Sequence, residues 1–196
     1  LLINDRTLIS KIINDDYVEF GAILTTSKDF LGGAIQLPDS LNYLDEGDVI
    51  KIDPKMNSIR TLFRRSSRHN FFLFTERCNH YCIMCSQPPK NVQDDWLADD
   101  MIQAIPLIDR NAEMIGITGG EPTLLGEKLF LVMKYMKAYL PNTALHILSN
   151  GRLFSDKKFV DEFSSINHSR TTVAIPLYSD VSEEHDYVVQ SKGAFD

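Results

Sequence analysis

The sequence predicts an α/β fold, in which the strands of a parallel sheet alternate with helices, preceded by a small β-rich module. Two observations lead to this prediction. From Asn70 onward, short apolar segments begin roughly every 28 to 43 residues with helical patterns between them, which is βαβ organisation. Before about residue 68, the apolar segments are short, close together and separated by turn residues, as in β-rich structure.

The composition is that of a globular protein. Of 196 residues, 43% are hydrophobic and 24% are charged, which excludes collagen-like, low-complexity and disordered chains. No apolar stretch reaches the roughly 20 residues that a membrane helix needs, and no signal segment opens the chain. The net charge of −7 disfavours binding to nucleic acids and to anionic membranes. We therefore expect neither of them as a partner.

Residues 1–68 form the predicted β-rich module. Apolar side chains alternate from Val18 to Leu24, and strand-like segments follow at residues 49–52 and 59–63. Turn residues separate these segments. The sequence of this module does not indicate its function. Residues 69–196 form the second predicted domain.

The second domain contains the predicted βαβ units. The apolar run Phe71–Phe74 is expected to be a strand buried on both faces. Ser155 is the expected N-cap of the last of three predicted helices. Further strands are predicted at residues 114–118, 145–148 and 172–177, and helices at residues 97–108, 127–140 and 156–163.

Both ends of the sequence suggest a piece of a longer chain. It opens on Leu1 without a starting Met, and it stops within Lys192–Asp196, where another helix is expected to begin. Stopping there would leave the fourth strand as an unprotected sheet edge, which stable proteins avoid. We expect a fold truncated after about four strands.

The three cysteines are the most informative residues. Cys78, Cys82 and Cys85 follow the first predicted strand of the sheet with the spacing Cys-x3-Cys-x2-Cys. An odd number in one short segment cannot form a disulfide framework, and it indicates a metal site in a reducing compartment such as the cytoplasm. Three thiolates can hold three irons of a [4Fe–4S] cluster and leave the fourth iron open. A structural zinc site is the alternative, but it needs a fourth ligand.

A second motif, Gly119-Gly120-Glu121-Pro122, follows the strand predicted at residues 114–118. It lies at the carboxyl end of that strand, where α/β sheets bind ligands. Glycines allow a ligand to approach the backbone closely because they have no Cβ. Ser149-Asn150-Gly151 occupies the equivalent place after the next strand.

Together these motifs resemble those of the radical S-adenosylmethionine (SAM) superfamily, and the resemblance covers residues 70–196. It implies a partial (β/α) TIM-type barrel, a [4Fe–4S] cluster held by the three cysteines, and SAM as the second cofactor. Met84 departs from the pattern, since the superfamily usually has an aromatic residue there. The segment 176–180 matches the ribose-binding pattern poorly. The implied SAM contacts are Gly119, Gly120, Glu121, Pro122, Ser149, Asn150 and, for the ribose, Ser179.

The resemblance also implies a reaction. One-electron reduction of the cluster cleaves SAM into methionine and a 5′-deoxyadenosyl radical, which abstracts hydrogen from a substrate. An electron donor such as flavodoxin or ferredoxin is implied. The sequence assigns no general acid or base, so the catalytic residues are unknown.

A narrower likeness involves three segments: Arg65–Asn70, Thr75–Cys78 and Cys85–Pro89. They resemble the HxsC maturases of the His-Xaa-Ser system. This implies modification of a peptide that carries His-Xaa-Ser repeats, with a second radical SAM protein as partner. Two alternatives stay open: a radical SAM enzyme acting on a small molecule, like 7-carboxy-7-deazaguanine synthase, and a zinc-binding module without catalysis.

Overall fold

The computed structural model describes residues 24–25 and 35–196, in two compact units that divide between Asp48 and Val49. In the first unit, β1 (Leu24–Thr25) pairs in parallel with β2 (Ile35–Gln36), and a 3₁₀ helix, η1, covers Asp39–Leu41. Residues 18–23 of the predicted alternating segment lie outside the described residues. The domain boundary expected at residue 68 stays a prediction.

The second unit begins with an antiparallel hairpin, β3 (Val49–Asp53) and β4 (Ser58–Phe63), which confirms the two strands predicted there. The hairpin contacts α2 (Trp96–Ala104) through charged side chains. Lys51 and Arg60 both lie over the Trp96 ring, 5.2 and 4.9 Å from its centroid. The Lys51 ammonium is also 2.6 Å from a carboxylate oxygen of Asp100. Electrostatic contacts therefore link the hairpin to the helix.

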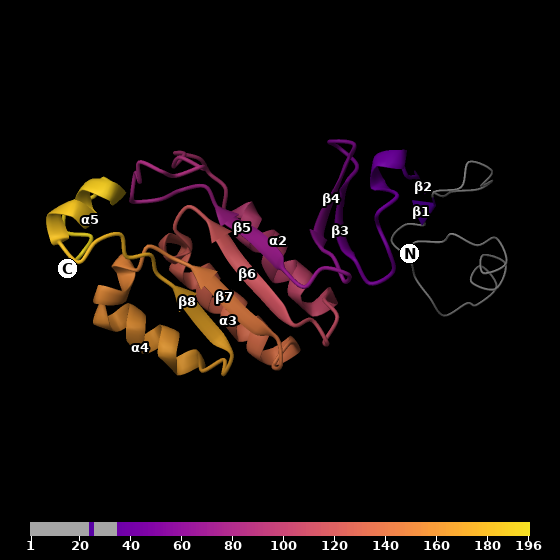
Figure 1. Ribbon diagram of the computed structural model, residues 1–196. Helices are drawn as coiled ribbons and strands as arrows, with labels where there is room; N and C mark the ends of the chain where they lie inside the picture. The colour runs from indigo at the N-terminus through magenta and orange to yellow at the C-terminus, as the bar shows by residue number, and fades with distance from the viewer. Residues whose placement is uncertain (1–23, 26–34) are drawn as a thin grey trace. The chain divides into compact units, whose positions relative to one another are not determined.

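A four-stranded parallel sheet forms the centre of this unit, with its strands in the order of the sequence (Figure 1). The predicted strands, their direction and their order are confirmed. Strand, helix and parallel strand follow one another, as in part of a β/α barrel. The strands are β5 (Asn70–Thr75), β6 (Met114–Gly119), β7 (Ala144–Leu148) and β8 (Thr171–Ala174).

The helices between the strands agree with the apolar patterns. The helix α2 continues into a 3₁₀ turn, η2 (Ile105–Leu107), and α3 (Gly126–Tyr139) and α4 (Lys157–Ile166) follow β6 and β7. The predicted cap of α4 is wrong. The N-cap is Asp156, whose carboxylate accepts hydrogen bonds from the amides of Lys158 and Phe159, because this residue has the extended backbone that lets a side chain reach those amides.

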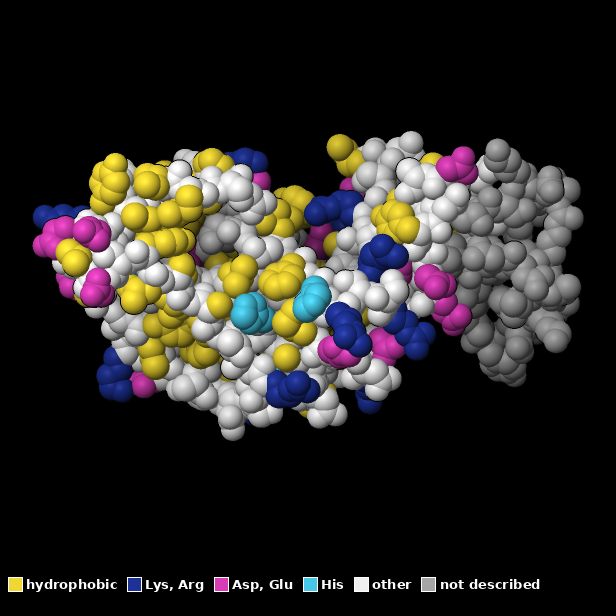
Figure 2. Space-filling model, in the orientation of Figure 1, with side chains coloured by type: hydrophobic (Ala, Val, Ile, Leu, Met, Phe, Trp, Pro, Cys, Tyr) yellow, Lys and Arg dark blue, Asp and Glu magenta, His cyan; other side chains and the backbone are white. Residues whose placement is uncertain are grey.

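The helices cover only one face of the sheet (Figure 1). Phe72 and Phe74 of β5 are buried, whereas Phe71, on the opposite face, is 42% exposed. The prediction of a strand buried on both faces is therefore wrong, because no helix packs against the second face within the described residues. Hydrophobic side chains are visible on this second face in Figure 2.

The segment after β8 differs from the prediction. A helix that the sequence analysis missed, α5, covers Ser182–Val189. The helix expected at Lys192–Asp196 is absent. Instead, the Asp186 carboxylate accepts hydrogen bonds from the amides of residues 193–195, which fold into a turn. Among the described residues, no helix is long and apolar enough to cross a membrane.

Candidate functional site

The candidate site lies at the carboxyl ends of β5, β6 and β7. The segment from residue 76 to residue 95, which we call the cysteine loop, follows β5 and carries all three thiols. Cys78 and Cys82 are partly buried and Cys85 is exposed, and none of them is in a disulfide. The Cys85 amide donates to the Cys82 carbonyl at 3.0 Å, which closes a turn between the second and third cysteines.

The two glycines after β6 let its backbone approach the start of the cysteine loop. The Gly120 amide donates to the Thr75 carbonyl at 2.7 Å, and the Glu121 amide donates to the Arg77 carbonyl at 2.8 Å. A Cβ on Gly120 would lie 2.0 Å from the Arg77 oxygen. Gly119 has φ +129°, and a Cβ there would lie 2.3 Å from the Thr75 oxygen. Contact with the end of β5 and with the start of the cysteine loop therefore requires both glycines, a reason that the sequence analysis did not foresee.

Glu121 is completely buried and joins the loops after β6 and β7. Its Oε1 accepts hydrogen bonds from the amide and hydroxyl of Thr123, at 3.0 and 2.6 Å, and from the Ser149 hydroxyl at 2.9 Å. Its Oε2 accepts from the Asn150 amide at 2.6 Å. Pro122 is buried beside it, at the start of a 3₁₀ helix, η3 (Pro122–Leu125). The structure thus brings the two predicted motifs together through one carboxylate.

Asn150 connects these motifs to the first cysteine. Its side-chain amide donates to Asn79 Oδ1 at 2.7 Å and lies 3.9 Å from the Cys78 sulfur. Gly151, at φ +81°, completes the turn that presents Asn150, and its amide donates to the Ser149 hydroxyl at 3.0 Å. The predicted residues of the first three loops therefore form one connected group.

Ser179 occupies a different setting. Its hydroxyl donates to Glu184 Oε2 at 2.7 Å and accepts from the Val181 amide at 3.1 Å. It thereby organises the turn that begins α5. The structure does not connect Ser179 to the group around Glu121, and a contact with the ribose stays a prediction.

The helix that the sequence analysis missed contacts the cysteine loop directly. The amides of Tyr81 and Ile83 donate to the carbonyls of Val189 and Val188, at 3.1 and 3.0 Å. His80, between the first two cysteines, is buried, and burial lowers the pKa of its ring. Within the described part of the chain, neither of its ring nitrogens has a hydrogen-bond partner.

The donor set fits an iron–sulfur cluster. Burial raises the pKa of the Cys78 and Cys82 thiols, and metal ligation would offset this by stabilising the thiolates. The His80 amide lies 3.4 Å from the Cys78 sulfur, as a donor toward it. No three His, Cys, Asp or Glu side chains of the described residues lie close enough to hold one metal ion. In a [4Fe–4S] cluster three thiolates bind three different irons, so the three sulfurs need not converge on one metal ion.

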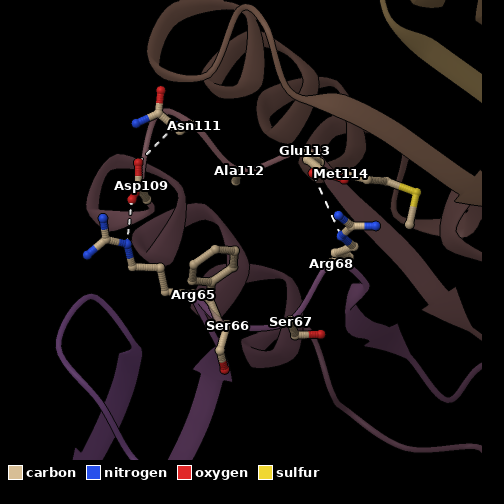
Figure 3. A pocket seen from close by; sticks show the side chains of 10 residues that line it. Arg65, Ser66, Ser67, Arg68, Asp109, Asn111, Ala112, Glu113 and Met114 are labelled. Carbon is tan, nitrogen blue, oxygen red and sulfur yellow. Dashed lines mark hydrogen bonds and ion pairs between the residues drawn. The ribbon is translucent and has the colours of Figure 1, made fainter.

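Two cavities flank the sheet. A cavity of about 200 Å³ borders the candidate site, between Gly120 and the cysteine-loop residues Ser86 and Lys90. A cavity of about 340 Å³ lies at the opposite, amino end of β6 (Figure 3). Its rim is formed by ion pairs, with 2.8 Å between Arg65 Nε and Asp109 Oδ2. None of the predicted site residues lines this second cavity.

The chain matches a known protein family. The model of the family described as the radical SAM superfamily matches residues 72–190, more than half of the chain. The matched span begins in β5, contains the three cysteines, and extends past α5. A search of curated proteins found no match.

Proposed function

Because this chain belongs to the radical SAM superfamily, whose members generally use a [4Fe–4S] cluster and SAM, we propose that Cys78, Cys82 and Cys85 hold such a cluster. The cluster would supply the electron that cleaves SAM to a 5′-deoxyadenosyl radical. One observation supports this most directly: three free thiols share a loop that is hydrogen-bonded to both Glu121 and Asn150.

SAM would bind beside the loops after β6 and β7. The methionyl part of SAM would contact Gly119, Gly120, Pro122 and Asn150. The ribose would contact Ser179. The Glu121 carboxylate already accepts four hydrogen bonds inside the protein, so its contribution is to hold these loops in place. Ser149 contributes in the same way, through its hydroxyl bond to Glu121.

For the substrate, we propose a ribosomally made peptide with His-Xaa-Ser repeats, modified together with a second radical SAM protein. The likeness of three segments to HxsC maturases supports this, and two of them adjoin the cysteines. The electron would come from a flavodoxin or a ferredoxin. Three unpaired thiols favour a reducing compartment, which we take to be the cytoplasm.

Metal analysis after anaerobic purification tests the cofactor proposal. We expect about four irons and four sulfides per chain, and 5′-deoxyadenosine after addition of SAM and dithionite. The variant with Ala at all three cysteines is the control and should contain neither iron nor sulfide. One zinc per chain without sulfide would contradict the proposal and favour a zinc-binding module.

Mass spectrometry tests the substrate proposal. A peptide with His-Xaa-Ser repeats should change mass when it is incubated with the reduced protein and SAM. A matched peptide with Ala in place of each His should not. If 5′-deoxyadenosine accumulates equally with and without the peptide, and the peptide mass is unchanged, a small-molecule substrate is favoured instead.

A further inference from the structure

Asp94 is a buried acidic residue outside all the predicted motifs. It lies just before α2, and only 3% of its surface is exposed. Its carboxylate accepts hydrogen bonds from the Thr75 hydroxyl at 2.9 Å, from the Glu76 amide at 2.5 Å and from Arg77 Nε at 3.1 Å. These donors belong to three consecutive residues that end directly before Cys78.

Two of these three residues also contact the segment that follows β6. The carbonyls of Thr75 and Arg77 accept the hydrogen bonds from Gly120 and Glu121. Asp94 therefore holds one side of a segment whose other side contacts the glycine motif. Cys78 directly follows this segment, which is held on both sides. The backbone position of Cys78 therefore depends on Asp94.

One backbone hydrogen bond and two ion pairs also close the base of the cysteine loop near Asp94. The Lys90 amide donates to the Glu76 carbonyl at 3.0 Å, and their side chains form an ion pair at 2.5 Å. The Arg77 guanidinium also pairs with Asp95. Both are more exposed than Asp94, and exposed ion pairs contribute little. The buried carboxylate is thus the principal contact at the base of the loop.

We propose that Asp94 is a positioning residue for the iron–sulfur cluster: it fixes residues 75–77 so that Cys78 is in place before the cluster binds. This inference rests on the proposed function. Its physical basis is that a buried carboxylate bonded to an amide, a hydroxyl and a guanidinium cannot be replaced by an amide without leaving donors unpaired. Side chains that hold metal ligands in place often contribute to metal affinity.

Asp94→Asn tests the proposal, with Asp100→Asn as the matched control. Asp100 is also a buried aspartate, 8% exposed, but it lies within α2 and pairs with Lys51 instead of the cysteine loop. We expect Asp94→Asn to lose iron to a chelator about tenfold faster than wild type, or more. The electron paramagnetic resonance spectrum of its reduced cluster should also change. The Asp100 variant should match wild type in both measurements.

A second measurement uses the protein without a cluster. In the apo-protein, Asp94→Asn should raise the alkylation rate of Cys78 relative to that of the exposed Cys85, measured by mass spectrometry. If Asp94→Asn does not fold, Thr75→Val removes one donor and gives the same measurements with smaller effects. Wild-type protein without iron would contradict the proposed function, whereas the alkylation ratio would still test the position of Cys78.

Three outcomes would overturn the inference. One is wild-type iron loss with an unchanged spectrum in Asp94→Asn. Another is that both aspartate variants lose iron faster than wild type, in proportion to the decrease in their melting temperatures. This would indicate general destabilisation. The third is an unchanged alkylation ratio for Cys78 in the apo-protein of Asp94→Asn.

Discussion

The Oε2 atom of Glu121 lies 2.6 Å from the backbone nitrogen of Asn150, across a gap of 29 residues in the chain. This hydrogen bond joins the loop after β6 to the loop after β7. Since Asn150 in turn contacts Asn79 in the cysteine loop, the carboxylate of Glu121 lies at the centre of the candidate site. Its role in this structure is to hold two loops together.

Glu121→Gln should therefore destabilise the fold. The side-chain amide must place its NH₂ group toward donors that now point at a carboxylate, which leaves at least one buried donor unpaired. We expect a loss of about 2–3 kcal/mol in the free energy of unfolding, measured by urea denaturation. Glu162→Gln, at an exposed position on α4, should stay within about 0.5 kcal/mol of wild type. Equal stability of Glu121→Gln and wild type would contradict this role.

Gly120→Ala should displace the cysteine loop. The added methyl would lie 2.0 Å from the Arg77 carbonyl oxygen, so the backbone must move. We expect a loss of about 1–3 kcal/mol in stability, together with weaker cluster retention. Gly126→Ala is the matched control, because its Cβ would have no neighbour closer than 3.9 Å. A crystal structure of Gly120→Ala with residues 75–78 unmoved would refute the prediction.

Cys82→Ala should abolish the intact cluster. Three thiolates are the smallest set that leaves a single iron open, so the loss of one leaves an incomplete, oxygen-labile cluster. Iron content and visible absorbance after anaerobic purification measure this. Tyr81→Phe, at the exposed neighbouring position, should retain its iron. Four irons per chain and an unchanged spectrum in Cys82→Ala would show that Cys82 is not a ligand.

His168 should make stability depend on pH. Burial lowers the pKa of its ring below the ordinary value of 6.5, so the unfolded chain binds the proton more readily than the folded protein. Its contribution to stability is complete above pH 6.5 and is lost as the pH falls from there through the folded-state pKa. We expect the free energy of unfolding, measured by urea denaturation, to fall less between pH 7 and pH 5 for His168→Gln than for the wild type. The exposed His69→Gln variant should follow the wild-type profile, and identical profiles for all three proteins would contradict the prediction.

The sequence was sufficient to predict the strand order because each strand is a short apolar segment between turn signals. It was also sufficient to predict α3, whose buried side chains recur on one face. It could not predict α5, since only His185 and Val189 of its eight residues are buried and no apolar stripe results. It overestimated the burial of Phe71, because an apolar run does not show whether one or both faces of a sheet are covered.

The site motifs were recognisable from the sequence, but their partners were not. Glu121 was found as part of a motif, yet its contacts with Ser149 and Asn150 span 28 and 29 residues. Asp94 was missed because a single aspartate after a proline-containing loop gives no local signal. Its importance comes from contacts that span 17 to 19 residues, which only the folded chain brings together.

The contact between the cysteine loop and α5 bears on the biogenesis of the protein. Tyr81 and Ile83 donate to carbonyls that the ribosome adds roughly a hundred residues later. Closing a loop of that length is entropically costly and comes late in folding. The segment between the first and third cysteines therefore lacks these two backbone hydrogen bonds until Val189 has been synthesised.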